Sequence, residues 1–237
     1  MARTTIEWTE CSWNPVTGCS KISAGCEHCY AERMAKRLCA MGQPRYRNGF
    51  KVTLHCDIVD LPLHWRMPRS IFVNSMSDLF HEKVPDAFIA SVVETIDAAS
   101  WHRFQLLTKR AERIAELDSR IKWPANAMLG VTVEHRATRG RIEALRASSA
   151  ACKFISFEPL IGPVGKVDLR GIDWVIVGGE SGPGARPMEE DWVLEIKHQA
   201  EALGIPFFFK QWGGVFKKKR GRSLEGREWN EMPIFAD

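Results

Sequence analysis

The chain has 237 residues, of which 45% are hydrophobic and 26% are charged, and its formal net charge is +4. This composition is ordinary for a globular protein, and no apolar run reaches the ~18–20 residues that a membrane helix needs. The first residues lack the apolar core of a signal peptide, so we expect a cytoplasmic protein with no membrane partner. We predict a single domain over residues 1–237, with a basic segment at about 214–237.

Short apolar runs alternate along the chain with helical patterns. The first helix is expected to follow Cys29 and to end near Cys39. Six later runs have the length and the β-branched or aromatic content of strands that are buried on both faces. These runs are 70–74, 104–107, 128–132, 153–157, 174–177 and 206–209. Helical spacing of apolar residues is found at 86–99, 110–118, 137–147 and 190–203. In the last helix, the residues predicted to face inward are Val193, Leu194, Ile196, Ala200 and Leu203.

Alternation of strands and helices predicts an α/β fold with a parallel sheet and right-handed crossovers. The spacing suits an open or partial (β/α) barrel of parallel strands with flanking helices, and a doubly wound sheet is the alternative, which periodicity alone does not separate from it. In either fold, chemistry takes place at the C-terminal ends of the strands. The residues at those positions are Asn74 to Asp78, Thr108, Lys109, Glu134, Glu158, Gly178 to Ser181, Lys210 and Gln211.

Three of the seven cysteines, Cys19, Cys26 and Cys29, lie within eleven residues of each other. An odd number of cysteines without a signal peptide argues against a disulfide scaffold. The two-residue gap before Cys29 lets both thiolates of that pair face one metal centre, and the Gly- and Ser-rich loop offers N–H groups to cluster sulfurs. Three cysteines on a [4Fe–4S] cluster would leave one iron open to a cofactor or a substrate.

Two other readings of these cysteines stay open on spacing alone. His28 lies inside the motif and His81 could approach it, which would complete a Cys3His zinc site. The spacing is not a standard zinc-finger pattern. Alternatively the thiols bind no metal and are buried as apolar groups, as is usual for free cysteines.

The cysteine loop resembles that of the radical S-adenosylmethionine (SAM) superfamily, with a first gap of six residues in place of the usual three. Asn14-Pro15 before Gly18-Cys19, and Cys29-Tyr30-Ala31 after it, are similar to members related to spore photoproduct lyase. Over nearly the whole chain, the amino-acid sequence is most similar to a phage-associated three-Cys-motif family of unassigned function. The further segments that carry this resemblance are 74–80, 106–109, 130–134, 157–160, 177–181 and 210–213.

The resemblance implies a partial barrel, a [4Fe–4S] cluster on Cys19, Cys26 and Cys29, and SAM bound to the open iron. It also implies a 5′-deoxyadenosyl radical that abstracts hydrogen from a substrate, and a reductant such as flavodoxin or ferredoxin. Members of the superfamily commonly hold the SAM amino group with a Gly-Gly-Glu motif after the second strand. This chain has other residues there, and the role is carried over to Ser75, Ser77 and Asp78.

Further cofactor-binding residues are expected at the other strand ends. The carboxylates that would bind the ribose or the amino group of SAM are Glu134, Glu158 and Glu180, each of which is equally typical of a helix start or a surface acid. Lys109 is a candidate for the SAM carboxylate, and Lys210 is expected to direct its ammonium into the barrel mouth. Four tryptophans near the motifs could stack on a base, although packing is the commoner role: Trp8, Trp13, Trp65 and Trp212.

We therefore predict a radical SAM enzyme that repairs or modifies a nucleic-acid base. The DNA or RNA partner is inferred from the resemblance and from the basic run Lys217 to Arg222, which is equally typical of a solvated loop. The alternatives are a zinc-stabilised nucleic-acid-binding module without catalysis, and a SAM-binding partner protein of a mobile-element system.

Overall fold

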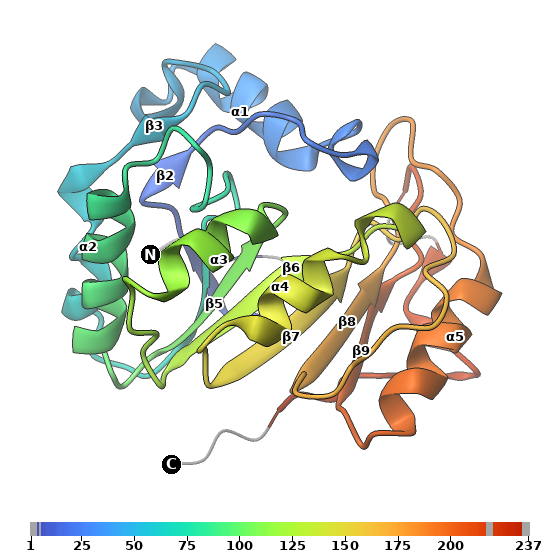
Figure 1. Cartoon of the computed structure of the whole chain (residues 1–237). Helices are drawn as coiled ribbons and strands as arrows, with labels where there is room; N and C mark the ends of the chain where they lie inside the picture. Colours follow the sequence, from blue (N-terminus) through green and yellow to red (C-terminus); the bar gives the residue numbers. More distant parts are fainter. Residues whose placement is uncertain (1–3, 5, 217–219, 234–237) are drawn as a thin grey trace.

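Seven strands form one parallel sheet that curls into a half-barrel (Figure 1). The computed structural model describes residue 4, residues 6–216 and residues 220–233. The strands are β1 (Cys11–Trp13), β4 (Ser70–Val73), β5 (Arg103–Thr108), β6 (Ala127–Thr132), β7 (Cys152–Phe157), β8 (Trp174–Gly178) and β9 (Phe207–Gln211). They lie side by side in that order, and every neighbouring pair is parallel. The predicted partial barrel is thus confirmed.

Helices cover the outer face of this sheet. They are α2 (Asp86–Ala98), α3 (Ala111–Asp118), α4 (Arg141–Ala147) and α5 (Glu190–Glu201), and α1 (Tyr30–Ala40) lies apart from them beyond the open edge of the sheet (Figure 1). Short 3-10 helices are η1 (Ala24–Cys26), η2 (Pro44–Tyr46), η3 (Cys56–Ile58), η4 (Leu61–His64) and η5 (Arg136–Thr138). Two small antiparallel pairs complete the fold: β2 (Val16–Thr17) with β3 (Thr53–Leu54), and β10 (Ser223–Leu224) with β11 (Arg227–Glu228). No helix among the described residues is long and apolar enough to cross a membrane.

The strands are buried on both faces, as their uninterrupted apolar runs predict. Residues on the outer face pack against the helices in the larger core, for example Leu106, Val131 and Ile155. The alternate residues face the hollow of the half-barrel and form a second, aromatic core with the N-terminal segment: Trp8, Phe72, Met128, Phe154, Trp174, Ile176 and Phe208. The Trp8 ring lies 4.7 Å from that of Phe72 and 6.1 Å from that of Trp174. This second core closes the hollow from below.

Two expectations from the sequence are wrong. Leu203 was expected to face inward, but α5 ends at Glu201 and Leu203 is 52% exposed. Gly204 adopts a positive φ of 66° there, which turns the chain so that Ile205 takes the buried place. Regular alternation also breaks between β7 and β8, because residues 158–173 contain no helix.

The predicted basic run is only partly described. Lys217, Lys218 and Lys219 lie outside the described residues. Arg222 is half-buried: its guanidinium lies 5.1 Å above the ring of Phe208 and 3.7 Å from a carboxylate oxygen of Glu228. This part of the run is tied to the fold and is not a free cation.

The tight inner core generates a prediction about Gly130. A Cβ at this position would lie 2.4 Å from the ring of Phe154, which is fully buried and held by Trp8 and Trp174. Gly130→Ala should therefore lower the free energy of unfolding by about 1–3 kcal/mol, as overpacking does. Urea denaturation followed by circular dichroism measures this.

Gly140→Ala is the matched control. Gly140 has φ −58°, and no atom lies within 4 Å of a Cβ built there. This variant should change the free energy of unfolding by no more than about 0.5 kcal/mol. Equal stability of the two variants would contradict the packing assigned to the inner core.

Candidate functional site

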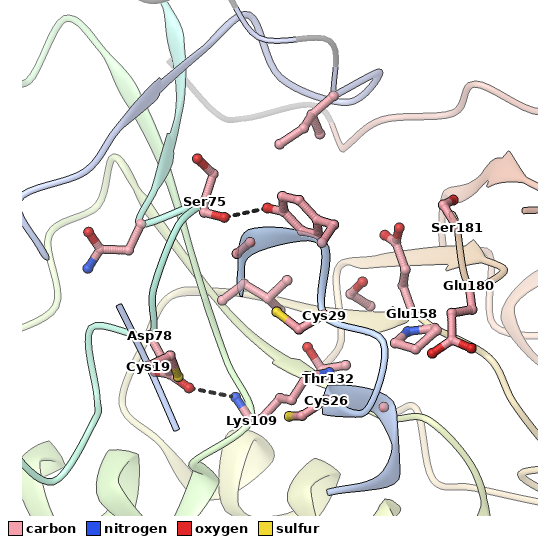
Figure 2. A pocket seen from close by; sticks show the side chains of 18 of the residues that line it. Cys19, Cys26, Cys29, Ser75, Asp78, Lys109, Thr132, Glu158, Glu180 and Ser181 are labelled. Atoms are coloured by element: carbon pink, nitrogen blue, oxygen red, sulfur yellow. Dashed lines mark hydrogen bonds between the residues drawn. The ribbon is translucent and has the colours of Figure 1, made fainter. Parts of the chain in front are cut away.

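A cavity of about 390 Å³ opens at the C-terminal edge of the sheet, which is the edge expected to carry the chemistry. The volume is within the range usual for small-molecule sites. Nearly all residues predicted for the site line it: Cys19, Cys26, Cys29, Ser75, Ser77, Asp78, Lys109, Glu158, Glu180 and Lys210 (Figure 2). Glu134 is absent from the lining and lies behind it, bonded to Lys109.

The three cysteines come from one loop between β2 and α1. Cys19 follows Gly18, whose φ of +82° and close approach to the carbonyl of Lys51 leave no room for a side chain. Cys26 ends η1, and Cys29 is the N-cap residue of α1. All three thiols are free. Cys29 therefore lies at the positive end of the α1 dipole.

The cysteines are spread around the cavity and do not converge on one point. Among the residues that the structure describes, no three His, Cys, Asp or Glu groups are close enough to hold a single ion. His81 is fully engaged elsewhere: one ring nitrogen lies 2.8 Å from the Ser20 hydroxyl and the other accepts the Lys83 N–H at 3.1 Å. This geometry disfavours the Cys3His zinc site with His81.

Arg110 connects the cysteine loop to the sheet. Its guanidinium lies 3.6 Å from the Cys19 sulfur and 3.3 Å from an Asp78 oxygen, and it donates to the Ser20 hydroxyl at 2.9 Å. Burial, with a smaller contribution from the Asp78 carboxylate, raises the pKa of the Cys19 thiol to about 12, although Arg110 opposes this rise. A buried cation thus lies beside the sulfur of Cys19.

Asp78 is at the centre of this connection. It accepts hydrogen bonds from the Thr108 hydroxyl at 2.7 and 2.9 Å and from the backbone N–H groups of Phe80 and Lys109. With Arg110 as a further donor, both carboxylate oxygens are already occupied. In this structure Asp78 therefore organises the cavity wall and has little capacity left for a ligand.

The two predicted serines are also engaged. The Ser75 hydroxyl donates to Asn14 Oδ1 at 3.2 Å, and the Ser77 hydroxyl donates to the carbonyl of Val16 at 2.8 Å. The backbone carbonyl of Ser75 accepts a bond from the Tyr30 hydroxyl, which ties α1 to the end of β4 (Figure 2). These contacts position the loop that faces the cysteines.

Glu134, which is buried behind the cavity lining, pairs with Lys109, which lines the cavity. Lys109 Nζ lies 2.7 Å from Glu134 Oε1, which also accepts the Ser23 hydroxyl at 2.6 Å. A Cβ at Gly25 would overlap the Glu134 side chain, so only glycine fits there. Burial alone would raise the pKa of the Glu134 carboxyl, but Lys109, Ser23 and Arg141 outweigh it and lower the pKa below its ordinary value.

Glu180 and Glu158 differ in how many of their carboxylate oxygens already accept a hydrogen bond. Both oxygens of Glu180 are bound by Arg186, at 2.5 and 2.9 Å from its side chain. Glu158 bonds Lys210 through Oε1 only, at 2.5 Å, and its side chain is 21% exposed in the cavity. Among the described residues no hydrogen bond to Glu158 Oε2 is found, so this carboxylate has an oxygen for a ligand.

Several buried polar atoms on the cavity lining have no partner. They are Trp8 Nε1, Asn74 Nδ2, Ser156 Oγ and Gln211 Oε1, in side chains that are at most 3% exposed. A buried polar group without a hydrogen bond is costly, and these atoms have almost no accessible surface although the cavity is empty, so they lie in the wall and do not face the cavity. The sequence reasoning missed Ser156 and Arg110 as site residues. Ser156 is recognisable only as a polar residue at an inward position of an apolar strand.

Of the four tryptophans considered for stacking, only Trp8 lines the cavity. Trp13 and Trp65 are buried in the larger core. Trp13 also donates to the carbonyl of Ile58, and Trp212 donates to that of Ser223.

A protein family described as "Protein of unknown function (DUF5131)" matches residues 3–233. A comparison with curated proteins finds no match.

Three solved structures of spore photoproduct lyase are similar, at 14% identity. One is a double mutant with bound AdoMet and dinucleoside spore photoproduct, with a TM-score of 0.45 over 79% of this chain and 60% of the other. A second, complexed with dinucleoside spore photoproduct, has a TM-score of 0.43 over 78% of this chain and 59% of the other. The chain thus spans about 60% of the length of these proteins, and the likeness concerns the arrangement of strands and helices.

The Glu134–Lys109 pair generates a prediction. Glu134→Gln leaves Lys109 without its charged partner and should lower the free energy of unfolding by about 2 kcal/mol at pH 7. Because the folded-state pKa of Glu134 is lowered, its stabilisation is complete above the unfolded-state pKa of about 4.3 and is lost as the pH falls through the folded-state value. The difference between wild type and variant should therefore shrink from pH 7 to pH 3.5 in urea titrations.

Glu143→Gln, in an exposed acid of α4, serves as the control and should leave stability within about 0.5 kcal/mol of wild type. A Glu134→Gln deficit that stays constant over this pH range would show that the Glu134 charge is not what stabilises the wall.

Proposed function

Since the chain belongs to the DUF5131 family, whose description leaves the activity open, we propose from its site that it is a radical SAM enzyme. Cys19, Cys26 and Cys29 hold a [4Fe–4S] cluster, and SAM occupies the adjoining cavity. The observation that carries this proposal is that three free thiols from one loop line a single cavity at the catalytic edge of a parallel half-barrel.

The surroundings of the thiols suit an anionic cluster with an organic cofactor beside it. Arg110 and the N-terminus of α1 supply positive charge near Cys19 and Cys29. When bound, such a cluster with SAM supplies a 5′-deoxyadenosyl radical that abstracts hydrogen from a substrate. The chain's own part is to hold the cofactor and to exclude water, and the aromatic core around Trp8 and Phe72 closes the floor against solvent.

The free oxygen of Glu158 is the best-placed acceptor for the SAM ammonium. Asp78 and Glu180 are saturated by Arg110 and Arg186, so they shape the cavity and do not bind the amino group directly. Lys109, in an ion pair with Glu134, and Lys210, in an ion pair with Glu158, both line the cavity. Their ammonium groups offer positive charge to the SAM carboxylate.

The substrate is a nucleic-acid base. A base inside a duplex is stacked and out of reach, so the target must be single-stranded or flipped into the cavity. Tyr30 lines the cavity and is exposed, so its ring can stack on such a base. A flavodoxin or a ferredoxin supplies the electron.

The cluster is tested by metal content. Protein that is reconstituted anaerobically with iron and sulfide should bind about four irons per chain. Cys19→Ala, Cys26→Ala and Cys29→Ala should each abolish this uptake, because each removes one of three ligands. Iron and zinc are measured by elemental analysis, and the brown colour is followed by absorbance.

Cys152→Ala is the matched control and should keep full iron content, because Cys152 begins β7 at the opposite end of the strands and packs on the aromatic core. One zinc per chain with no iron under anaerobic conditions would overturn the cluster. Loss of iron in the Cys152 variant as large as in the others would make the assignment of ligands wrong.

SAM binding tests the role of Glu158. Glu158→Gln should weaken SAM binding roughly tenfold or more, since a charged hydrogen bond contributes about 1.5–3 kcal/mol. Iron content should stay at the wild-type value. Isothermal titration calorimetry on anaerobic protein measures the affinity, and Glu195→Gln, in an exposed acid on α5, should bind SAM as wild type does. Unchanged affinity of the Glu158 variant would place the amino group elsewhere.

A further inference from the structure

One of the two basic segments of the chain lies beside the cavity. Residues 21–51 contain seven Lys and Arg residues and two Glu residues, whereas the whole chain has 33 basic and 29 acidic residues. The excess of five positive charges in this segment therefore exceeds the net charge of +4 for the entire protein. The run 217–222 has the same excess of five positive charges, so the chain has two basic segments, and residues 21–51 are the one that the structure describes in full.

This segment forms the rim of the cavity. It runs from the cysteine loop through α1 and η2, beyond the C-terminal ends of the strands (Figure 1). Tyr30 at one end of this run and Phe50 near the other both line the cavity. Lys51 is in backbone contact with Gly18, next to Cys19. The charged surface is thus continuous with the cavity mouth.

Part of this charge is neutralised within the fold. Glu32 pairs with Lys21 and Lys36, and Asp57 pairs with Arg45. Arg37, Arg47 and Lys51 are exposed, and among residues 6–216 and 220–233 none forms an ion pair with them. We call these three residues the basic rim. Three exposed cations without counter-charges are typical of a surface that binds a polyanion.

We infer that the basic rim binds the phosphate backbone of single-stranded nucleic acid and leads one base into the cavity. The inference rests on the proposed function for the nature of the substrate, and its physical basis is the local charge. Aromatic rings beside the rim favour nucleic acid over an acidic peptide, because Tyr30, 51% exposed, and Phe50 can stack on bases. Within the C-terminal basic run, Arg222 is already paired with Glu228, so the inference rests on the rim.

The test is oligonucleotide binding by fluorescence anisotropy across NaCl concentrations. A labelled single-stranded 12-mer is titrated with wild type, with the rim variant Arg37→Gln/Arg47→Gln/Lys51→Gln, and with a control variant. The control, Arg66→Gln/Lys122→Gln/Lys166→Gln, removes the same charge from exposed residues in segments that lead into the N-terminal ends of strands. Iron content after reconstitution is measured for all three proteins.

The rim variant should bind at least tenfold more weakly at 50 mM NaCl. Its slope of log affinity against log salt should fall by about 2, as loss of three phosphate contacts to a single strand predicts. The control should stay within about twofold of wild type. Equal losses in both variants, or binding of a polyglutamate peptide as tight as that of the oligonucleotide, would overturn the inference.

The iron measurement separates this inference from the proposed function. A rim variant that loses nucleic-acid binding while wild type takes up no iron would support the docking surface and contradict the radical SAM assignment. Wild type that takes up iron but binds no single-stranded oligonucleotide at low salt would support the radical SAM assignment and contradict the docking surface.

Discussion

The buried contact of Arg110 with Asp78 and Cys19 is the interaction on which the site depends. It joins the end of β4, the start of α3 and the cysteine loop in one hydrogen-bonded group. Both Asp78 oxygens and most guanidinium nitrogens are used, so neither charge is left uncompensated. Further contacts of the cysteine loop with the strand ends are made by the backbone of Gly18, by Ser20 with His81, by Ser23 with Glu134 and by the Tyr30 hydroxyl.

The two faces of the sheet explain why the cavity can be both open and dry. On the outer face, helices cover the apolar residues. On the inner face none of the described residues forms a covering helix, and Trp8 with the aromatic residues of β4, β7, β8 and β9 fills the lower half of the hollow. Above this core, the side chains at the C-terminal strand ends are polar and form hydrogen bonds with other residues of the cavity wall. They therefore leave the upper half of the hollow open. A half-barrel closed from below and rimmed by α1 is suited to a cofactor and a substrate that meet at its mouth.

Much of the fold follows from local patterns, and most of the pairing in the site does not. Six strands were predicted because each is an apolar run, whereas β1 was missed because Cys11–Trp13 is only three residues long. The cysteines and the strand-end acids were found by motif and position. Arg110, Ser156 and the basic rim were not, because their roles depend on contacts between segments far apart in the sequence. The role of Asp78 depends on such contacts as well. Its position at a strand end predicts that it binds a ligand, whereas its neighbours already form hydrogen bonds with both of its carboxylate oxygens.

The central claim is that three cysteines hold a cluster with an iron left open to SAM. Electron paramagnetic resonance of the anaerobically reconstituted, dithionite-reduced protein, with and without SAM, tests this most directly. We predict the signal of a reduced [4Fe–4S] cluster whose g-values shift when SAM is added, because the open iron gains ligands. A signal that is unchanged at saturating SAM, or no signal from protein that holds zinc in place of iron, would contradict it.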